Sequence, residues 1–172
     1  MALSSNSEAT LATVRKVIAE RAHLAGSLLP ILHGVQEALG HVPRDALPEI
    51  AAALNLSRAE VHGVVSYYHH FREQPAGRCL VQVCRAESCQ TMGADALLAH
   101  ARQSLGCSEA RPTSIDDAFT VEPVYCLGLC ASSPAAMIGA RLHARLTPSR
   151  FDAAIAAASA HESAAARGAE RA

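Results

Sequence analysis

The chain has 172 residues, of which 50% are apolar and 3% aromatic, and its 15 basic and 16 acidic residues nearly cancel. This balance argues against the basic field that nucleic acid or an anionic membrane would select, so neither is expected as a partner. The N-terminal residues lack the apolar run of a secretory signal, and no segment approaches the roughly 18 consecutive apolar residues of a membrane span. We therefore expect a cytoplasmic protein, in which six cysteines are more often metal ligands, redox groups or packed thiols than disulfides.

The first 74 residues show the three-and-four spacing of apolar residues that is typical of amphipathic helices. Ser57 and Glu60 have the spacing of a capping box, and Asp45 is a candidate N-cap. Gly40 and Asn55 suit helix ends. We expect a bundle of short helices over residues 7–23, 30–40, 45–55 and 57–68.

The pattern changes at "REQPAGR", residues 72–78, because its proline and glycine break the helical period. Beyond it we expect strands over 79–84, 119–126, 134–139 and 141–147, a helix over 93–106, and a last helix that Thr147 caps. This is the element order of a thioredoxin-like α/β domain. The predicted fold class is α+β, with a helical domain at 1–74, a thioredoxin-like domain at 75–160 and a flexible tail at 161–172.

Two pairs of cysteines follow predicted strands, Cys84 with Cys89 and Cys126 with Cys130. Loops that leave the same end of a sheet can face one another, and four thiolates brought together need cations to neutralise them. Structural zinc sites usually have tight two-residue knuckles, whereas gaps of four and three residues suit the larger [2Fe-2S] rhomb. The spacing favours iron and sulfide, and zinc or buried reduced thiols stay open as alternatives.

Other kinds of cysteine chemistry fit the sequence less well. No pair has the C-x-x-C spacing of a redox dithiol, and neither cysteine loop contains the histidines of a Rieske centre. Cys79 and Cys107 fit better as packed thiols. The chain also has no Gly-rich dinucleotide fingerprint, so a nicotinamide or flavin would have to lie on another polypeptide.

Several motifs resemble, in order and spacing, the small [2Fe-2S] subunits that flank the flavin in respiratory complex I. They are "LLPILHGVQEALGHVP", "HGVVSYYHHFREQPAGR", "VQVCRAESCQTMGADALL", "SIDDAFTVEPVYCLGLCASSP" and "RLTP". The similarity covers about residues 20–152. The same family includes the corresponding subunits of NAD-linked formate dehydrogenases and bidirectional hydrogenases, and "VCRAESCQ" looks most like the gamma subunits of the soluble, molybdenum-containing formate dehydrogenases.

The resemblance implies one [2Fe-2S] cluster held by Cys84, Cys89, Cys126 and Cys130. It further implies an electron-transfer subunit without a substrate site of its own, which exchanges single electrons with FMN in an NAD-binding flavoprotein subunit. In the formate branch, a large subunit would carry the molybdenum cofactor. The alternatives are the equivalent subunit of complex I or of an NAD-linked hydrogenase, and, outside this class, a zinc-stapled assembly module.

Some positions near the cysteines depart from the family pattern. Asp117 and Gly139 stand where the family commonly has Gly and Asn, and Ser133 stands where it commonly has Ala. None of them replaces a cysteine, but Ser133 adds a hydrogen-bond donor near the sulfurs.

Overall fold

The computed structural model of the chain describes residues 2–169. Contacts within the chain divide it into two units, Met1–Pro75 and Ala76–Ala172, and each unit is described by itself. Among the described residues, no helix is both long enough and apolar enough to cross a bilayer.

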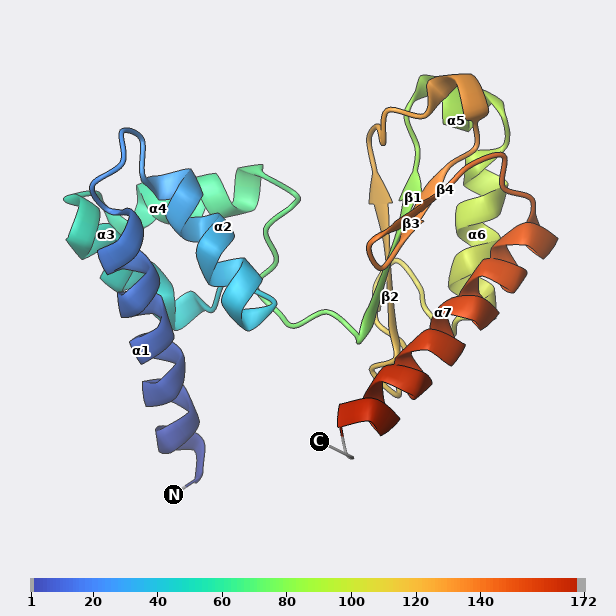
Figure 1. The fold of residues 1–172 in the computed structure, drawn as a ribbon. Coiled ribbons are helices and arrows are strands. Elements are labelled where there is room, and N and C mark those ends of the chain that lie inside the picture. The colour runs from blue at the N-terminus through green and yellow to red at the C-terminus, as the bar shows by residue number, and fades with distance from the viewer. Residues whose placement is uncertain (1, 170–172) are drawn as a thin grey trace. The chain divides into compact units, whose positions relative to one another are not determined.

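The first unit is helical, as the sequence predicts (Figure 1). Its core is aliphatic apart from Phe71, and Ile31, Leu32, Val35 and Ile50 are fully buried in it. Its elements are α1 (Ala2–Arg21), α2 (Leu28–Leu39), the 3₁₀ helix η1 (Arg44–Ala46), α3 (Leu47–Leu54) and α4 (Arg58–Tyr67).

α1 begins at Ala2 and ends at Arg21, whereas a helix over 7–23 was expected. At the other helix ends the predicted signals are formed with one exception. Gly40 and Asn55 end α2 and α3 with φ of 76° and 54°, and both halves of the capping box between Ser57 and Glu60 are formed. Asp45 is not the N-cap that its position suggested. It lies within η1, and α3 instead follows Ala46 without a side-chain cap, because the 3₁₀ turn leads directly into the helix.

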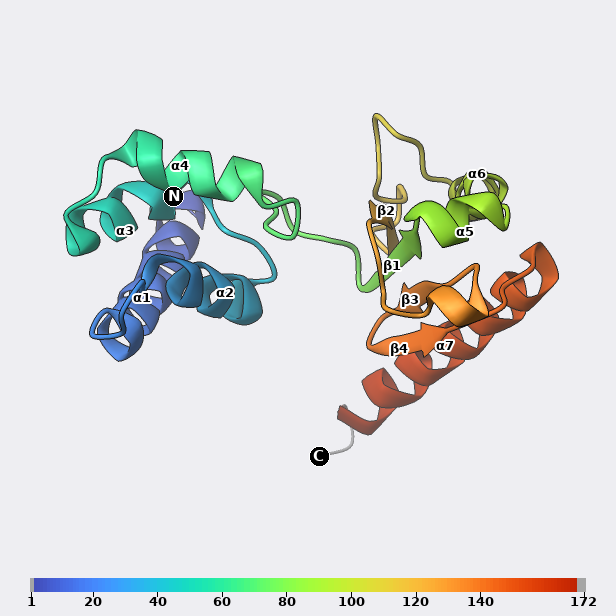
Figure 2. The same cartoon turned by 90° about the horizontal axis from the view of Figure 1, so that it is seen from above.

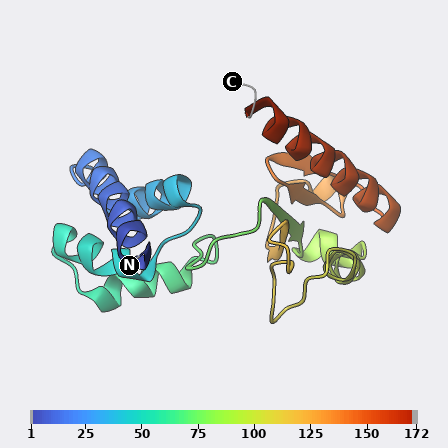
Figure 3. The ribbon, with the colours of Figure 1, turned by 90° about the horizontal axis from the view of Figure 1, so that it is seen from below.

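The second unit contains a four-stranded mixed sheet in the order β2-β1-β3-β4 (Figure 2). β1 runs parallel to β2 and antiparallel to β3, and β3 pairs with β4 in an antiparallel hairpin. Helices α6 and α7 cover the same face of the sheet (Figure 3). The elements are β1 (Cys79–Cys84), α5 (Glu87–Thr91), α6 (Ala94–Ser104), β2 (Phe119–Val124), the 3₁₀ helix η2 (Cys130–Ser132), β3 (Ala136–Ile138), β4 (Arg141–His143) and α7 (Pro148–Ala169).

The core of the second unit lies between the sheet and these two helices. Val81, Val83 and Val121 from the strands and Phe151 from α7 are fully buried there. Thr147 caps α7 as predicted, since its Oγ1 accepts a hydrogen bond from the N–H of Arg150. The backbone stays helical through residues 161–169, most of the stretch for which the sequence indicated a tail, and residues 170–172 lie outside the described part.

Candidate functional site

The register of the sheet brings the two cysteine loops together. β1 and β2 are parallel, and Cys84 at the end of β1 is paired with Val124 at the end of β2. The chain therefore leaves both strands at the same level, at the carboxyl-terminal end of this parallel pair. Cys89 follows on α5, Cys126 lies just past β2, and Cys130 begins η2, which lies at the same end of the unit as α5 (Figures 1 and 2).

The sulfur of Cys84 joins the two loops. It accepts hydrogen bonds from the N–H groups of Ala86, Leu127 and Cys126, and the single proton of the Cys89 thiol is within reach of both this sulfur and the Ser133 hydroxyl. Burial is the largest influence and opposes ionisation, but the donors together outweigh it and lower the pKa of the Cys84 thiol. The backbone of the second loop thus already favours a thiolate on the first.

The second pair of cysteines shows the opposite effect. A hydrogen bond with Cys126 raises the pKa of the Cys130 thiol, and charge on Cys126, burial, and charges on Cys89 and Cys84 raise it further. Each of the other three sulfurs therefore lies within electrostatic reach of Cys130. Four thiolates at these positions would repel one another unless a cationic centre lay between them.

The loop after β2 is bent so that its amides point at sulfur. Cys126 has a φ of 110°, which is sterically unfavourable for a residue with a Cβ. Gly128 follows with a φ of 77°, and its N–H donates to the Cys126 Sγ over 3.4 Å. Successive backbone N–H groups that converge in this way form an anion-binding concavity of the kind found at iron-sulfur sites.

The site has a buried side and an exposed side. Cys84 and Cys89 are 2% exposed and pack with Ala94 and Ala135 in a small apolar cluster, whereas Cys126 and Cys130 are exposed. All six cysteines of the chain are free thiols in the structure. A group bound here would be held from within the protein and open to solvent on one edge.

These residues fit the [2Fe-2S] cluster that the family resemblance implies. Two irons need two thiolates each, and the site supplies two hydrogen-bonded cysteine pairs on facing loops, with N–H donors aimed at the sulfurs. Among residues 7–160, whose side chains the structure describes, no three His, Cys, Asp or Glu side chains meet closely enough to hold a single metal ion. The donor set fits a cluster that spans the two loops.

Two serines connect the cysteine loops on their polar side. Ser88 on α5 and Ser133 after η2 lie 2.7 Å apart, oxygen to oxygen, and both hydroxyls reach the carbonyl of Cys130, at 2.9 and 2.8 Å. The Cys89 thiol donates to the Ser133 oxygen over 3.7 Å. The sequence pointed to Ser133, but no sequence signal pointed to Ser88, because its role depends on a contact between segments 45 positions apart.

The positive charge of Arg85, next to Cys84, is compensated by a carboxylate. Arg85 donates from Nε to the Oδ1 of Asp95 over 2.7 Å. This hydrogen bond, with a second from Gln90, lowers the pKa of the Asp95 carboxyl. Arg85 therefore brings a neutral ion pair, rather than an isolated positive charge, to the neighbourhood of the sulfurs.

The remaining cysteines are packed, as expected. Cys79 and Cys107 are buried in the core of the second unit. Burial raises the pKa of the Cys107 thiol, and its Sγ donates to the carbonyl of Leu105 over 3.5 Å. Cys107 belongs to the main hydrophobic core of the unit and not to the small cluster around Cys84 and Cys89, so it is not a candidate ligand.

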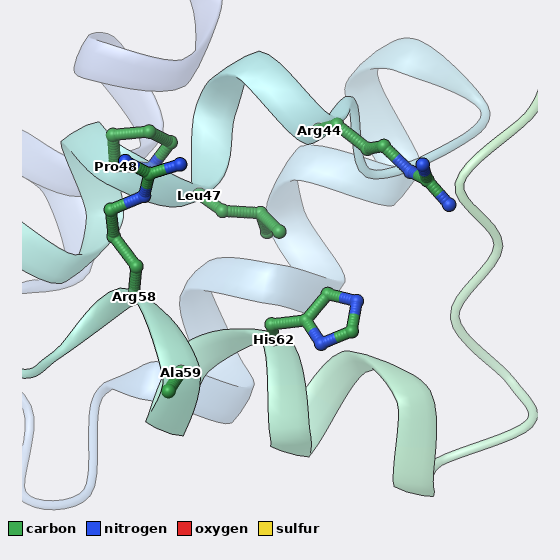
Figure 4. A pocket seen from close by; sticks show the side chains of 6 residues that line it. All are labelled: Arg44, Leu47, Pro48, Arg58, Ala59 and His62. Carbon is green, nitrogen blue, oxygen red and sulfur yellow. The ribbon is translucent and has the colours of Figure 1, made fainter.

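A hollow of about 390 Å³ on the helical unit is lined by two arginines and a histidine among other residues. Arg44 is already paired with Glu73 at 2.6 Å, and Figure 4 shows the guanidinium groups of Arg44 and Arg58 on opposite sides of Leu47. The basic groups do not converge on one point, so this hollow has no anion site comparable to the cysteine loops. It is lined by Arg44, Leu47, Pro48, Arg58, Ala59 and His62.

Comparison with known proteins connects both units with one family. The model of the family described as thioredoxin-like [2Fe-2S] ferredoxin matches residues 14–159. This match confirms the predicted fold class, a helical N-terminal part followed by a thioredoxin-like domain, and the predicted [2Fe-2S] cofactor.

Individual relatives are subunits of larger oxidoreductases. A subunit of the NADH-quinone oxidoreductase of Rhizobium meliloti is 35% identical over 127 residues, which cover 74% of this chain and 75% of that protein. The HndA subunit of the NADP-reducing hydrogenase of Solidesulfovibrio fructosivorans is 30% identical over 123 residues, covering 72% of this chain and 71% of that protein.

A solved structure extends the comparison to three dimensions. An NAD⁺-reducing [NiFe]-hydrogenase in the air-oxidized state superposes with a TM-score of 0.63 at 28% identity. The superposition covers 78% of this chain but only 23% of that hydrogenase chain, so the present chain spans less than a quarter of the hydrogenase chain it resembles.

Proposed function

Because this chain belongs to the family of thioredoxin-like [2Fe-2S] ferredoxins, we propose that it is the electron-transfer subunit of an NAD-linked oxidoreductase. In this proposal Cys84, Cys89, Cys126 and Cys130 hold one [2Fe-2S] cluster. When bound, such a cluster takes up and releases one electron at a time. The observation that carries the proposal is the convergence of both cysteine loops on the Cys84 sulfur, with Cys130 in reach of all the other three.

In this proposal, the residues of this chain bind the cluster and shield it from water, and they do not act on a substrate. The N–H groups around Cys84 and Cys126 stabilise negative charge on the sulfurs, and the apolar cluster around Cys89 keeps water from the inner side. Cys126 and Cys130 lie at the surface, which lets a redox partner approach the site closely.

The proposed partner is a flavoprotein subunit that binds FMN and NAD. Hydride transfer to NAD moves two electrons, whereas the cluster exchanges one, and a flavin can do both. The chain itself has no dinucleotide fingerprint, which supports a nucleotide site on another subunit. We place this complex in the cytoplasm, because cysteines that act as metal ligands or packed thiols rather than forming disulfides are typical of a reducing compartment.

Within the family we propose the formate dehydrogenase branch, in which a large molybdenum-containing subunit oxidises formate. The support is the sequence "VCRAESCQ" between and around the first two cysteines. The alternative is the corresponding subunit of a NADH-quinone oxidoreductase or an NAD-linked hydrogenase, which the names of the relatives favour. The neighbouring genes separate these branches: a large molybdenum subunit supports formate, a hydrogenase pair supports hydrogen, and a run of membrane subunits supports quinone reduction.

The ligand set is tested by Cys126→Ser in the assembled complex, with Cys107→Ser as the matched control. We expect Cys126→Ser to abolish the electron paramagnetic resonance signal of the reduced cluster and to slow NAD reduction strongly, because one iron loses a thiolate. Cys107→Ser should keep both, since Cys107 is packed in the core away from the loops. The expected loss of activity assumes that electrons for NAD reduction pass through this cluster. Wild-type NAD reduction in a Cys126→Ser complex that has lost the signal would contradict this direct route.

Metal analysis separates the proposal from a zinc-stapled module. We expect about two irons and about two acid-labile sulfides per chain, with a brown colour that dithionite bleaches. One zinc and no sulfide per chain would overturn the proposal.

A further inference from the structure

The hydroxyl groups of Ser88 and Ser133 form a closed set of contacts beside Cys89. Their oxygens are 2.7 Å apart, and either hydroxyl also reaches the Cys130 carbonyl. In the free-thiol state the Cys89 S–H donates to Ser133 over 3.7 Å. Both serines are half-buried, and they belong to different cysteine loops.

When Cys89 binds iron, the hydrogen bonds among Cys89, Ser88 and Ser133 must be rearranged. An iron-bound thiolate carries no proton, so the Cys89 sulfur turns from a donor into an acceptor. Each serine has a single hydroxyl proton, and two oxygens 2.7 Å apart need one of these protons between them. The other proton can go either to the Cys130 carbonyl or to the Cys89 sulfur.

The Cys89 sulfur is the stronger hydrogen-bond acceptor for that proton. It carries negative charge when bound to iron, and charge-assisted hydrogen bonds are roughly twice as strong as neutral ones. The Cys89 side chain is also buried, so water does not supply a donor, whereas Cys130 belongs to the exposed side of the site. The favoured arrangement is a chain in which Ser88 donates to Ser133 and Ser133 donates to Cys89, each bond strengthening the next.

We propose that Ser133, oriented by Ser88, donates a hydrogen bond to the iron-bound sulfur of Cys89 and thereby makes the cluster of this chain easier to reduce. One electron enters the cluster and the hydroxyl proton stays on Ser133 in both states. The bond is stronger in the reduced state, because the sulfur is then more negative. The inference rests on the proposed function, and in particular on Cys89 as a ligand.

The test is a redox titration of the full chain with its reconstituted cluster, followed by electron paramagnetic resonance. Ser133→Ala should shift the midpoint potential to more negative values, so that at a fixed potential the ratio of reduced to oxidised cluster falls roughly tenfold, about 59 mV for a one-electron couple. Ser88→Ala should shift it in the same direction but less. Ser132→Ala is the matched control in the same loop, because no hydrogen bond of its side chain occurs in the described structure, and it should leave the potential unchanged.

The possible results separate a failure of the proposed function from a failure of the role of Ser133. A wild-type chain that forms no [2Fe-2S] signal would contradict the proposed function. A normal signal with the same potential in Ser133→Ala and wild type, or an equal shift in Ser132→Ala, would overturn the role of Ser133. If Ser133→Ala does not assemble a cluster, the isosteric pair Ser133→Thr and Ser133→Val replaces it. The threonine, which keeps the hydroxyl, should retain the higher potential, and equal potentials in the pair would overturn the inference.

Discussion

Gly77, which enters the second unit just before β1, lies where no larger side chain fits. A Cβ at this position would be 2.8 Å from the backbone carbon of Phe119 and 3.0 Å from the carbonyl oxygen of Asp117. The N–H of Gly77 also donates to the Thr120 Oγ1 over 2.7 Å. The contacts are to backbone, which cannot rotate away as the end of a side chain can.

We predict that Gly77→Ala destabilises the chain by about 1–3 kcal/mol, because the added methyl group overpacks against β2. Gly63→Ala is the matched control, since a Cβ there meets nothing within 4 Å in the interior of α4. It should stabilise the helix by up to about 1 kcal/mol. Urea unfolding followed by circular dichroism measures both, and equal stability of Gly77→Ala and wild type would refute the steric argument.

The four cysteines could be singled out as candidate ligands from their spacing after predicted strands, but their surroundings could not be predicted. Cys84, Cys89, Cys126 and Cys130 stand out in the sequence because strand ends precede each pair. The donation from the Leu127 N–H to the Cys84 sulfur depends on how the second loop bends, which in turn depends on the unusual φ of Cys126. Nothing in local sequence marks a cysteine as the residue that will take a positive φ.

Among the helices, α4 has the best-defined start. The Ser57 hydroxyl accepts from the Glu60 N–H over 3.2 Å, and the Glu60 carboxylate accepts from the Ser57 N–H over 2.8 Å. We predict that Ser57→Ala lowers the free energy of unfolding by about 1 kcal/mol, because the Glu60 N–H loses the hydroxyl that accepts its hydrogen bond. A loss of helix protection confined to α4, measured by amide hydrogen exchange, would identify the cap as the cause, and unchanged protection would argue against it.

The same cap predicts a pH dependence. Hydrogen bonds from the Ser57 N–H and then from its hydroxyl lower the pKa of Glu60. The stabilisation is therefore fully present above the unfolded-state value of about 4.3 and is lost as the pH falls through the lower folded-state pKa.

Glu60→Gln removes the titrating group without changing its shape. We expect this variant to be less stable than wild type at neutral pH and the two to converge below the folded-state pKa of Glu60, in urea unfolding at a series of pH values. A stability difference that is independent of pH would contradict the contribution of the charged cap.

At the level of elements, periodicity, turn residues and caps predicted that the long helices and all of the strands exist, although α1 and α7 extend beyond their expected bounds. The prediction failed where tertiary contacts decide. α5 (Glu87–Thr91) was expected as a loop, because five residues are too few for a helical period to show. Its position is fixed instead by Ser88 and by buried Cys89. Asp45 has the side chain of a cap, but the preceding Pro43 leads the chain into a 3₁₀ turn, and that turn takes the place of a capped start.

The molecule as a whole consists of two units, each with a separate hydrophobic core. The polypeptide between them, residues 74–76, has no hydrogen bond in the described structure, and Gln74 and Pro75 are exposed. The predicted domain boundary between residues 74 and 75 stays a prediction that proteolysis can test.

Brief digestion with subtilisin should cut first within residues 74–77 and leave two fragments that resist further cleavage, because the exposed connection opens more easily than either core. Mass spectrometry of the first products measures this. First cuts inside β1 or α6 would show that the second unit is less stable than the connection, contrary to the two-core arrangement.

The parallel register of β1 and β2 also has a topological consequence. Cys89 and Cys126 are separated by the whole of α6 and β2, yet they lie at one sheet edge. Once all four cysteines share one cluster, that stretch of chain is tied into a closed ring, and the unfolded polypeptide loses much of its conformational freedom. If the four cysteines hold the cluster as proposed, we expect the iron-loaded protein to be more stable than the iron-free protein by on the order of 2–4 kcal/mol, by analogy with a disulfide that closes a comparable ring.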